Sequence, residues 1–379
     1  MKFHIFFSTA SKVVLTAALG GILVSCSSGP EKPKPAELTA NPALFGVRLA
    51  WTTKIGTVDF PLDIKVNGTK FSVASTDGLV GSFDAVTGAE VWRTHVGTPI
   101  SAGVGSDGRF ASVVTRGNEL ITLDAGREIW RQKLSAQSFT SPLVAGGRVF
   151  VLAADRSLSA FDAQSGRKLW NQQRPGESLI LRQSGVLMAV GDTLVAGFAG
   201  RLVGVNPLNG TSRWESPIAS PRGTNDIERL VDLVGRVSRE ADVVCARAFQ
   251  AAVGCVDASR GALLWTKPAD GFVGVHGDEK FVFGVEGDGK IIAWRRADGE
   301  RAWISERLRF RSLTAPLVVG RSVAVGDDAG FVHLLSREDG SVLTRITTDG
   351  SAIATAPVLA GGSLVVVTRS GGVFGFKPE

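Results

Sequence analysis

Short runs of alternating apolar and polar residues, with a period of two, fill most of the chain. This period is typical of half-buried β-strands, and the 3.6-residue spacing of an amphipathic helix is almost absent. Turn signals separate the runs, among them Asp77-Gly78, Gly146-Gly147, Asp288-Gly289 and Gly361-Gly362. The pattern therefore predicts an all-β protein of short strands and tight turns.

One segment of this pattern, Ser159–Trp170 (SAFDAQSGRKLW), recurs along the chain, with clear copies at Phe83–Trp92 and Val256–Trp265. In each copy an apolar strand ends at an Asp, a Ser/Thr-Gly turn follows, and the next strand carries a Trp. The Asp position returns about every 42 residues, which indicates a repeat architecture. It is occupied by Asp84, Asp124, Asp162, Asn206, Asp257, Arg295, Ser336 and Lys377.

A four-stranded unit of this size cannot bury both faces of its sheet alone, so successive units must stack on one another. Four strands at such a period are typical of a propeller blade. The eight Asp positions therefore predict an eight-bladed β-propeller with four-stranded antiparallel blades. We interpret the repeated Trp residues as packing between blades, because each has the same place in its unit.

The two ends of the repeat predict how the ring closes. The last unit stops at Phe376–Glu379, before its turn and Trp strand, and an unassigned strand of that character lies at Leu44–Trp51. We expect this N-terminal strand to complete the last blade as its outer strand, which leaves no open sheet edge. The alternative is an open solenoid with frayed ends.

Residues 1–25 have the features of an export signal. Lys2 and Lys12 supply the positive charge, and Val13–Val24 supplies an apolar core of 12 residues. A helix needs about 20 apolar residues to cross a bilayer, so this core is too short to be a membrane span. We expect the segment to be removed.

The segment Leu23–Cys26 (LVSC) resembles a bacterial lipobox. The resemblance implies that Cys26 becomes an acylated N-terminus, and that the chain is anchored by lipid at the periplasmic face of the outer membrane, since Ser27 is not Asp. Residues 26–43 are rich in Pro and polar residues and predict a flexible, unpacked tether. Residues 44–379 are expected to form a single propeller domain. The alternative is an ordinary secretory signal with an accidental Cys.

Charge and motifs exclude several classes of function. The net charge of +6 comes from scattered Lys and Arg residues, without a block that would indicate nucleic-acid binding. Gly103–Gly108 (GVGSDG) matches a dinucleotide-binding fingerprint, but no helix is expected after it, so we reject the match. The four His residues are dispersed, and no metal-binding or nucleophile motif is present. The sequence predicts no catalytic residues, no metal and no cofactor.

Two cysteines remain after Cys26. Cys245 and Cys255 flank the predicted hairpin Val243–Val256, whose turn falls near Gln250, so we expect them nearly opposite each other on paired strands. The periplasm is oxidising, and we predict a structural disulfide between them. Two buried free thiols are the alternative.

Two links between units, Arg174–Ser184 and Ser216–Val234, are longer than the others. They have the same place in neighbouring units, between a Trp strand and the next first strand, so we expect them on one face. Aliphatic residues beside charges on a rigid scaffold favour a protein-binding surface. The alternative is that the links fold inward and bury their leucines. The residues concerned are Leu179, Ile180, Leu181, Arg182, Asp226, Glu228, Arg229, Leu230 and Asp232.

The FDAxSGxxxW unit resembles the PQQ-like propeller repeat. Lipobox, tether, eight blades and the link motifs SLILR and NDIERL together resemble the BamB family, the lipoprotein subunit of the outer-membrane β-barrel assembly machinery. This resemblance implies a non-enzymatic scaffold that binds the periplasmic POTRA domains of BamA and helps to deliver or fold outer-membrane β-barrel precursors.

The resemblance also implies which residues bind BamA. The family's leucine, arginine and acidic contacts fall on Leu179, Leu181, Arg182 and Asp232, and we add Arg229 to this partner-binding surface. Physically, the leucines would fill an apolar groove, and the charged residues would set orientation. A second acidic position of some relatives holds Val234 here, which departs from the family pattern.

Two other functions are compatible with a propeller. A PQQ-dependent quinoprotein dehydrogenase needs an Asp base, calcium ligands and usually adjacent cysteines, and this sequence has no adjacent cysteines. A second possibility is that exposed blade edges bind unfolded barrel strands by β-augmentation. No residue pattern marks such a site.

Overall fold

The structure is a computed structural model that describes residues 1, 33–175, 179–222, 224–225 and 228–379. The chain divides into two units, Met1–Lys34 and Pro35–Glu379, and every strand among the described residues lies in the second unit. No helix among the described residues is long and apolar enough to cross a membrane.

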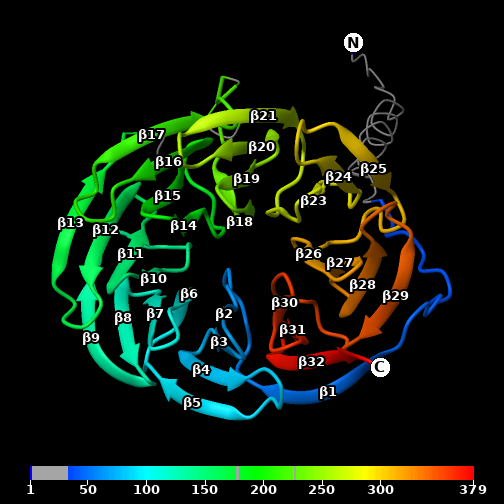
Figure 1. The fold of residues 1–379 in the computed structure, drawn as a ribbon, viewed down its shortest axis with the longest axis horizontal. Coiled ribbons are helices and arrows are strands. Elements are labelled where there is room, and N and C mark those ends of the chain that lie inside the picture. Colours follow the sequence, from blue (N-terminus) through cyan, green and yellow to red (C-terminus); the bar gives the residue numbers. More distant parts are fainter. Residues whose placement is uncertain (2–32, 176–178, 223, 226–227) are drawn as a thin grey trace. The chain divides into compact units, whose positions relative to one another are not determined.

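The second unit is a ring of eight antiparallel sheets of four strands each, which confirms the predicted eight-bladed β-propeller (Figure 1). Blades 1 to 4 consist of β2 (Lys65–Asn67), β3 (Lys70–Ala74), β4 (Leu79–Asp84) and β5 (Glu90–His95); β6 (Ile100–Ser106), β7 (Phe110–Thr115), β8 (Glu119–Asp124) and β9 (Arg127–Lys133); β10 (Leu143–Ala145), β11 (Arg148–Leu152), β12 (Ser157–Asp162) and β13 (Lys168–Gln173); β14 (Leu187–Val190), β15 (Thr193–Phe198), β16 (Arg201–Val205) and β17 (Ser212–Pro217).

Blades 5 to 8 repeat this order around the rest of the ring. They consist of β18 (Leu233–Glu240), β19 (Val243–Ala248), β20 (Ala252–Asp257) and β21 (Ala262–Pro268); β22 (His276–Gly277), β23 (Phe281–Val285), β24 (Ile291–Arg295) and β25 (Arg301–Ser305); β26 (Leu317–Val319), β27 (Ser322–Gly326), β28 (Phe331–Ser336) and β29 (Val342–Thr347); β30 (Val358–Ala360), β31 (Ser363–Val367), β32 (Gly372–Pro378) and β1 (Val47–Lys54).

The first strand closes the ring, as predicted. β1 pairs antiparallel with β32, with Val47 opposite Pro378 and Lys54 opposite Gly372. The strand begins and ends three residues later than the predicted Leu44–Trp51. Blade 8 therefore combines the two ends of the repeat, and no blade lacks its outer strand.

The repeated Asp forms the turn between the third and fourth strands of a blade. In blade 3, Asp162 Oδ1 accepts hydrogen bonds from Ser165 N and Ser165 Oγ at 2.8 and 2.7 Å, and from Gln164 N at 3.2 Å. Asp84 and Asp257 make similar bonds to their own turns. The side chain thus satisfies backbone donors that the turn leaves outside the sheet ladder.

Each repeated Trp packs against the turn of the following blade, which confirms the structural interpretation of these residues. Trp130 of blade 2 donates its indole N–H to Ala163 O of blade 3 at 2.8 Å. Its ring lies against Gly166, where an added Cβ would come within 2.6 Å of the indole and where φ is +71°. Corresponding contacts join Trp51 to Gly88, Trp92 to Gly126, Trp170 to Gly210, Trp214 to Gly261, Trp265 to Gly299 and Trp303 to Gly340.

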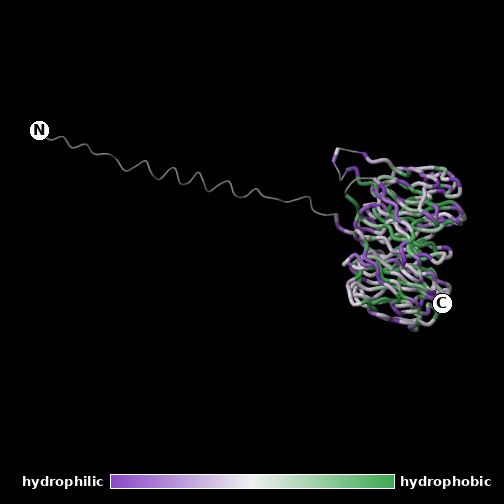
Figure 2. Tube along the Cα trace, turned by 90° about the vertical axis from the view of Figure 1, so that its left-hand side faces the viewer, coloured by the Kyte–Doolittle hydropathy of each residue, from purple (hydrophilic) through white to green (hydrophobic). Residues whose placement is uncertain are grey.

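The hydrophobic core lies mainly between neighbouring blades. Trp51 and Val365 of blade 8, for example, belong to one buried cluster with Phe71 and Phe83 of blade 1. In the edge-on view of Figure 2, hydrophobic positions run along the strands in the body of the ring. Stacking of blades therefore buries what a single sheet would leave exposed.

Cys245 and Cys255 are direct cross-strand partners in β19 and β20. The structure joins them by a disulfide, with their Cα atoms 3.9 Å apart, and both residues are fully buried.

The ring has two distinct faces because strands alternate in direction within every blade. The links from one blade to the next and the turns between second and third strands share one face, which we call the loop face. The remaining turns form the opposite face. A central channel of about 670 Å³ is lined in part by Leu62, Val237, Leu313 and Ile353.

The segment before β1 differs from the expected unpacked tether. The second unit starts at Pro35, and Ala36 and Leu44 donate backbone hydrogen bonds to Arg309 O and Leu343 O. In Figure 1 this dark-blue chain passes outside β29 before it enters β1. Residues 35–44 are thus attached to the propeller.

Candidate functional site

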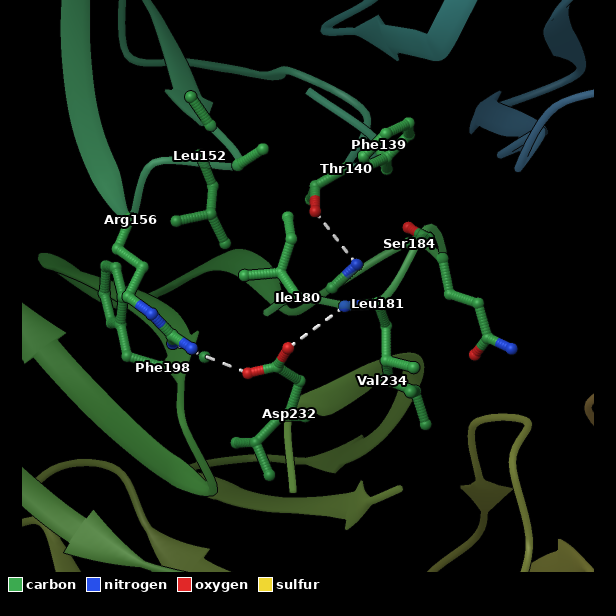
Figure 3. Close-up of a pocket in the computed structure, with 16 residues that line it drawn as sticks. Phe139, Thr140, Leu152, Arg156, Ile180, Leu181, Ser184, Phe198, Asp232 and Val234 are labelled. Carbon is green, nitrogen blue, oxygen red and sulfur yellow. Dashed lines mark hydrogen bonds and ion pairs between the residues drawn. The ribbon is translucent and has the colours of Figure 1, made fainter. Parts of the chain in front are cut away.

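The two long links lie side by side on the loop face, over blades 3 to 5 (Figure 3). The first connects β13 to β14 and the second connects β17 to β18. Leu181 N in the first link donates a hydrogen bond to Asp232 Oδ2 in the second at 3.2 Å. At the base of the links, Gly235 N donates to Ser184 O at 2.7 Å. The structure therefore brings together the two segments that the sequence placed on one face.

Arg156 connects the first link to the second. It lies in the turn between β11 and β12, and its side chain is only 9% exposed. Its Nη1 lies 3.5 Å from Asp232 Oδ1 (Figure 3). Its Nη2 donates to Leu179 O at 3.4 Å. Sequence reasoning missed Arg156, because it belongs to neither link. The sequence offered one indication: the turn that contains Arg156 joins the second and third strands of its blade, and such turns lie on the same face as the links.

The links are partly buried and partly exposed. Ile180 and Leu181 are half-buried and line a cavity of about 60 Å³ together with Leu152 and Phe198. Leu179 is 38% exposed. One link therefore combines the two alternatives: Ile180 and Leu181 turn inward, and Leu179 remains on the surface.

Arg182 is exposed at the end of this link. Its guanidinium lies over the ring of Phe139, with 5.5 Å between the guanidinium carbon and the ring centroid. Arg182 also lines the loop-face part of the central channel. Stacking on an aromatic ring holds the cation in place while its donors face solvent.

The second link carries the half-buried residues Arg229 and Leu230. Before them, Glu228 Oε2 accepts a hydrogen bond from Thr224 N at 2.9 Å, and this bond lowers the pKa of the Glu228 carboxyl. Glu228 N donates in turn to Asn225 Oδ1 at 2.9 Å, which closes a local turn. Asp226, which the sequence assigned to this surface, lies outside the described residues.

Val234 does not belong to the exposed surface. It is 1% exposed in β18 and pairs with Arg247 across the ladder. A carboxylate at this position would be buried, and burial disfavours its charged form. The departure from the family pattern at Val234 therefore does not change the exposed residues of the site.

The arrangement is suited to binding a protein. It presents an exposed leucine and an exposed arginine, Leu179 and Arg182, on a backbone that is held by Arg156 of blade 3 and by Asp232 in the link between blades 4 and 5. Apolar and Arg anchors on a preorganised backbone are the residues that dominate protein interfaces. Among the described residues no group of His, Cys, Asp and Glu has the arrangement of a metal site.

A family model and the sequences of known proteins both indicate the same family. Residues 76–305, more than half of the chain, match the family model described as "Outer membrane protein assembly factor BamB". The outer membrane protein assembly factor BamB of Burkholderia pseudomallei is 38% identical over 371 residues, which cover 97% of this chain and 97% of that relative.

Solved structures share the fold. The crystal structure of BamB from Moraxella catarrhalis has a TM-score of 0.80 at 24% identity and covers 88% of this chain and 100% of that one. Quinohemoprotein alcohol dehydrogenase from Comamonas testosteroni has a TM-score of 0.68 at 15% identity, over 90% of this chain and 78% of that one. At such identities the likeness shows the propeller architecture alone.

Proposed function

The chain belongs to the BamB family of outer membrane protein assembly factors, and from this membership we propose that its loop face binds the periplasmic POTRA region of BamA. Its role in the outer-membrane assembly machinery is that of a scaffold and not of an enzyme. The Burkholderia pseudomallei relative, which matches 97% of the chain, is named as an assembly factor, and the quinohemoprotein alcohol dehydrogenase shares only the fold. The proposal concerns the surface and the partner through which the scaffold acts.

One observation carries the proposal. Leu179 and Arg182 are exposed on the same short segment, while Asp232 accepts a hydrogen bond from the Leu181 backbone between them. The segment is therefore ordered before any partner arrives, so little conformational entropy is lost on binding. An apolar anchor supplies affinity, and an arginine beside it sets orientation.

The test is to measure binding of the mature chain to the BamA periplasmic region by titration calorimetry. We expect Leu179→Ala and Arg182→Ala each to weaken binding by about 2 kcal/mol or more, as at an interface hot spot. Leu208→Ala is the matched control, because Leu208 is 64% exposed in the turn between β16 and β17, on the opposite face. Unchanged affinity in both link variants would place the interface elsewhere.

We also propose that Cys26 is acylated, which would anchor the propeller at the periplasmic face of the outer membrane. The support is the lipobox at Leu23–Cys26 behind a signal-peptide pattern. Mass spectrometry of the mature N-terminal peptide should show Cys26 as the first residue, carrying fatty acyl chains. A mature chain that begins at another residue, or an unmodified Cys26, would overturn this proposal.

A further inference from the structure

Residues 35–44, which we call the strap, run along the outer side of blade 7. At one end, Ala36 N donates to Arg309 O at 2.8 Å, and Arg311 Nε donates to Ala36 O at 3.2 Å. In the middle, Leu38 packs against a buried cluster that includes Leu308. The strap is thus held by hydrogen bonds and by apolar contact.

The second half of the strap follows β29 in the antiparallel direction. Asn41 Oδ1 accepts from Arg345 N at 2.8 Å, and Asn41 Nδ2 donates to Arg345 O at 3.0 Å. Farther along, Leu44 N donates to Leu343 O at 2.9 Å. The side-chain amide of Asn41 therefore satisfies both backbone groups of an edge residue, as a further strand would.

β29 is more buried than an outer strand elsewhere in the ring. Leu343, Thr344 and Ile346 are 9%, 4% and 7% exposed, whereas β13, the outer strand of blade 3, has no buried residue. Ile346 is buried in a cluster that it shares with blade 8, and the strap adds hydrogen bonds along the strand at Leu343 and Arg345.

The course of the strap reverses the face from which the N-terminal chain leaves the propeller. β1 begins on the opposite face, because Val47 pairs with Pro378 at the end of β32, while Lys54 leads into the link to blade 1. Ala36, in contrast, lies beside Arg309 in the link between β25 and β26, which belongs to the loop face. Without the strap, the chain would leave from the opposite face.

We infer that the strap turns the loop face toward the membrane, so that the two long links meet their protein partner in the space between propeller and bilayer. This inference rests on the proposed acylation of Cys26. The nine residues from Cys26 to Pro35 span at most about 30 Å when fully extended. The loop face is therefore held near the lipid surface, at a high effective concentration for a membrane-proximal partner.

The experiment uses the acylated chain in phospholipid vesicles that carry a headgroup energy acceptor. A donor dye is attached at Arg116→Cys, in the turn between β7 and β8 on the loop face, or at Gln164→Cys, in the turn between β12 and β13 on the opposite face. Both positions are exposed, and Cys245 and Cys255 are paired and buried. We expect higher energy transfer from position 116 than from position 164.

A second pair of measurements tests the strap itself. In Leu38→Ser/Asn41→Ala the strap is released, so the difference in transfer between the two positions should be lost. Glu37→Gln is the matched control, since Glu37 is exposed in the strap, and it should keep the difference. Hydrogen exchange at Leu44 N reports release independently, because the variant keeps both this amide and its acceptor Leu343 O.

The outcomes separate the inference from its premise. A chain that does not stay with the vesicles would overturn the proposed acylation and, with it, the inference. Vesicle attachment with equal transfer from both positions, or a difference that survives release of the strap, would overturn the inference alone. Neither result would affect the proposed binding of the loop face to BamA, which is measured without a membrane.

Discussion

At the scale of single residues, Asp232 makes contacts within the protein that the family resemblance does not include. The resemblance places it in direct contact with the partner. In the structure its Oδ2 accepts from Leu181 N and its Oδ1 lies 3.5 Å from Arg156 Nη1. Its backbone O accepts from Phe249 N at 3.0 Å. We therefore interpret Asp232 as a positioning residue for the segment that carries Leu179 and Arg182.

This interpretation predicts different effects for two substitutions of Asp232. Asp232→Ala removes an acceptor from the Leu181 amide and a counter-charge from the largely buried Arg156, so we expect a loss of about 1–3 kcal/mol in the free energy of unfolding. Asp232→Asn retains a carbonyl acceptor for Leu181 N and should lose less. Urea denaturation measures both changes, and calorimetry with BamA should show weaker binding for Asp232→Ala.

An exposed ion pair supplies the control for this comparison. Arg213 Nη1 lies 2.7 Å from Asp192 Oδ1, but the Asp192 side chain is 83% exposed. Asp192→Ala should therefore cost only about 0–1 kcal/mol, as is usual for surface pairs. Equal losses for Asp232→Ala and Asp192→Ala, with BamA binding intact in both, would contradict the positioning role.

At the scale of elements, the blade turn explains why the sequence repeat is so recognisable. Hydrogen bonds from Ser165 lower the pKa of Asp162, and Thr87 and Ser259 lower those of Asp84 and Asp257 in the same way. The charged carboxylate is thus preferred in the folded state. In blade 4 the neutral Asn206 makes the corresponding bond to Leu208 N at 2.9 Å, so the turn needs an acceptor rather than a charge.

Acid stability should follow from these lowered pKa values. Their contribution to stability is fully present above the unfolded-state pKa of about 3.9 and is lost as the pH falls through the lower folded-state values. Asp162→Asn should fold at pH 7 and should lose less stability between about pH 4 and pH 2 than the parent chain. Urea unfolding at a series of pH values is the measurement, and identical acid dependence of variant and parent would refute the prediction.

The contact between neighbouring blades also explains why one repeat, at β29, lacks the Trp. Seven outer strands carry a Trp that packs on the turn glycine of the next blade. β29 has Thr344 at this position, and the blade that follows is blade 8, whose third and fourth strands, β32 and β1, come from opposite ends of the chain. That blade has no connecting turn and hence no glycine for a Trp to cover. Loss of the motif at one junction is therefore a consequence of ring closure.

At the scale of the whole molecule, pairing of β1 with β32 closes a ring whose two faces carry different segments. The long links, Arg156 and the start of the strap all belong to the loop face, whereas the opposite face carries short turns. A rigid ring fixes the relative positions of residues that are far apart in sequence. Partner binding and membrane attachment would then be coupled by geometry alone, without a conformational change.

The sequence by itself determined the class of fold, the number of blades, the closing strand and the position of the long links. It did so because these features repeat: a contact that recurs about every 42 residues leaves the same residue types at the same spacing. The Asp of the turn and the Trp of the outer strand are examples, since each has a partner at a constant place in the same blade or the next.

Only the tertiary structure decided which link residues are exposed, that Arg156 and Asp232 join two links, that Val234 is buried, and that the strap covers β29. These features depend on single contacts, such as those of Arg156 with Asp232, 76 positions apart, and of Asn41 with Arg345, 304 positions apart. A contact that occurs once has no period, and a Pro-rich segment has the same composition whether it is free or attached. Such contacts become visible only when the blades are closed into a ring.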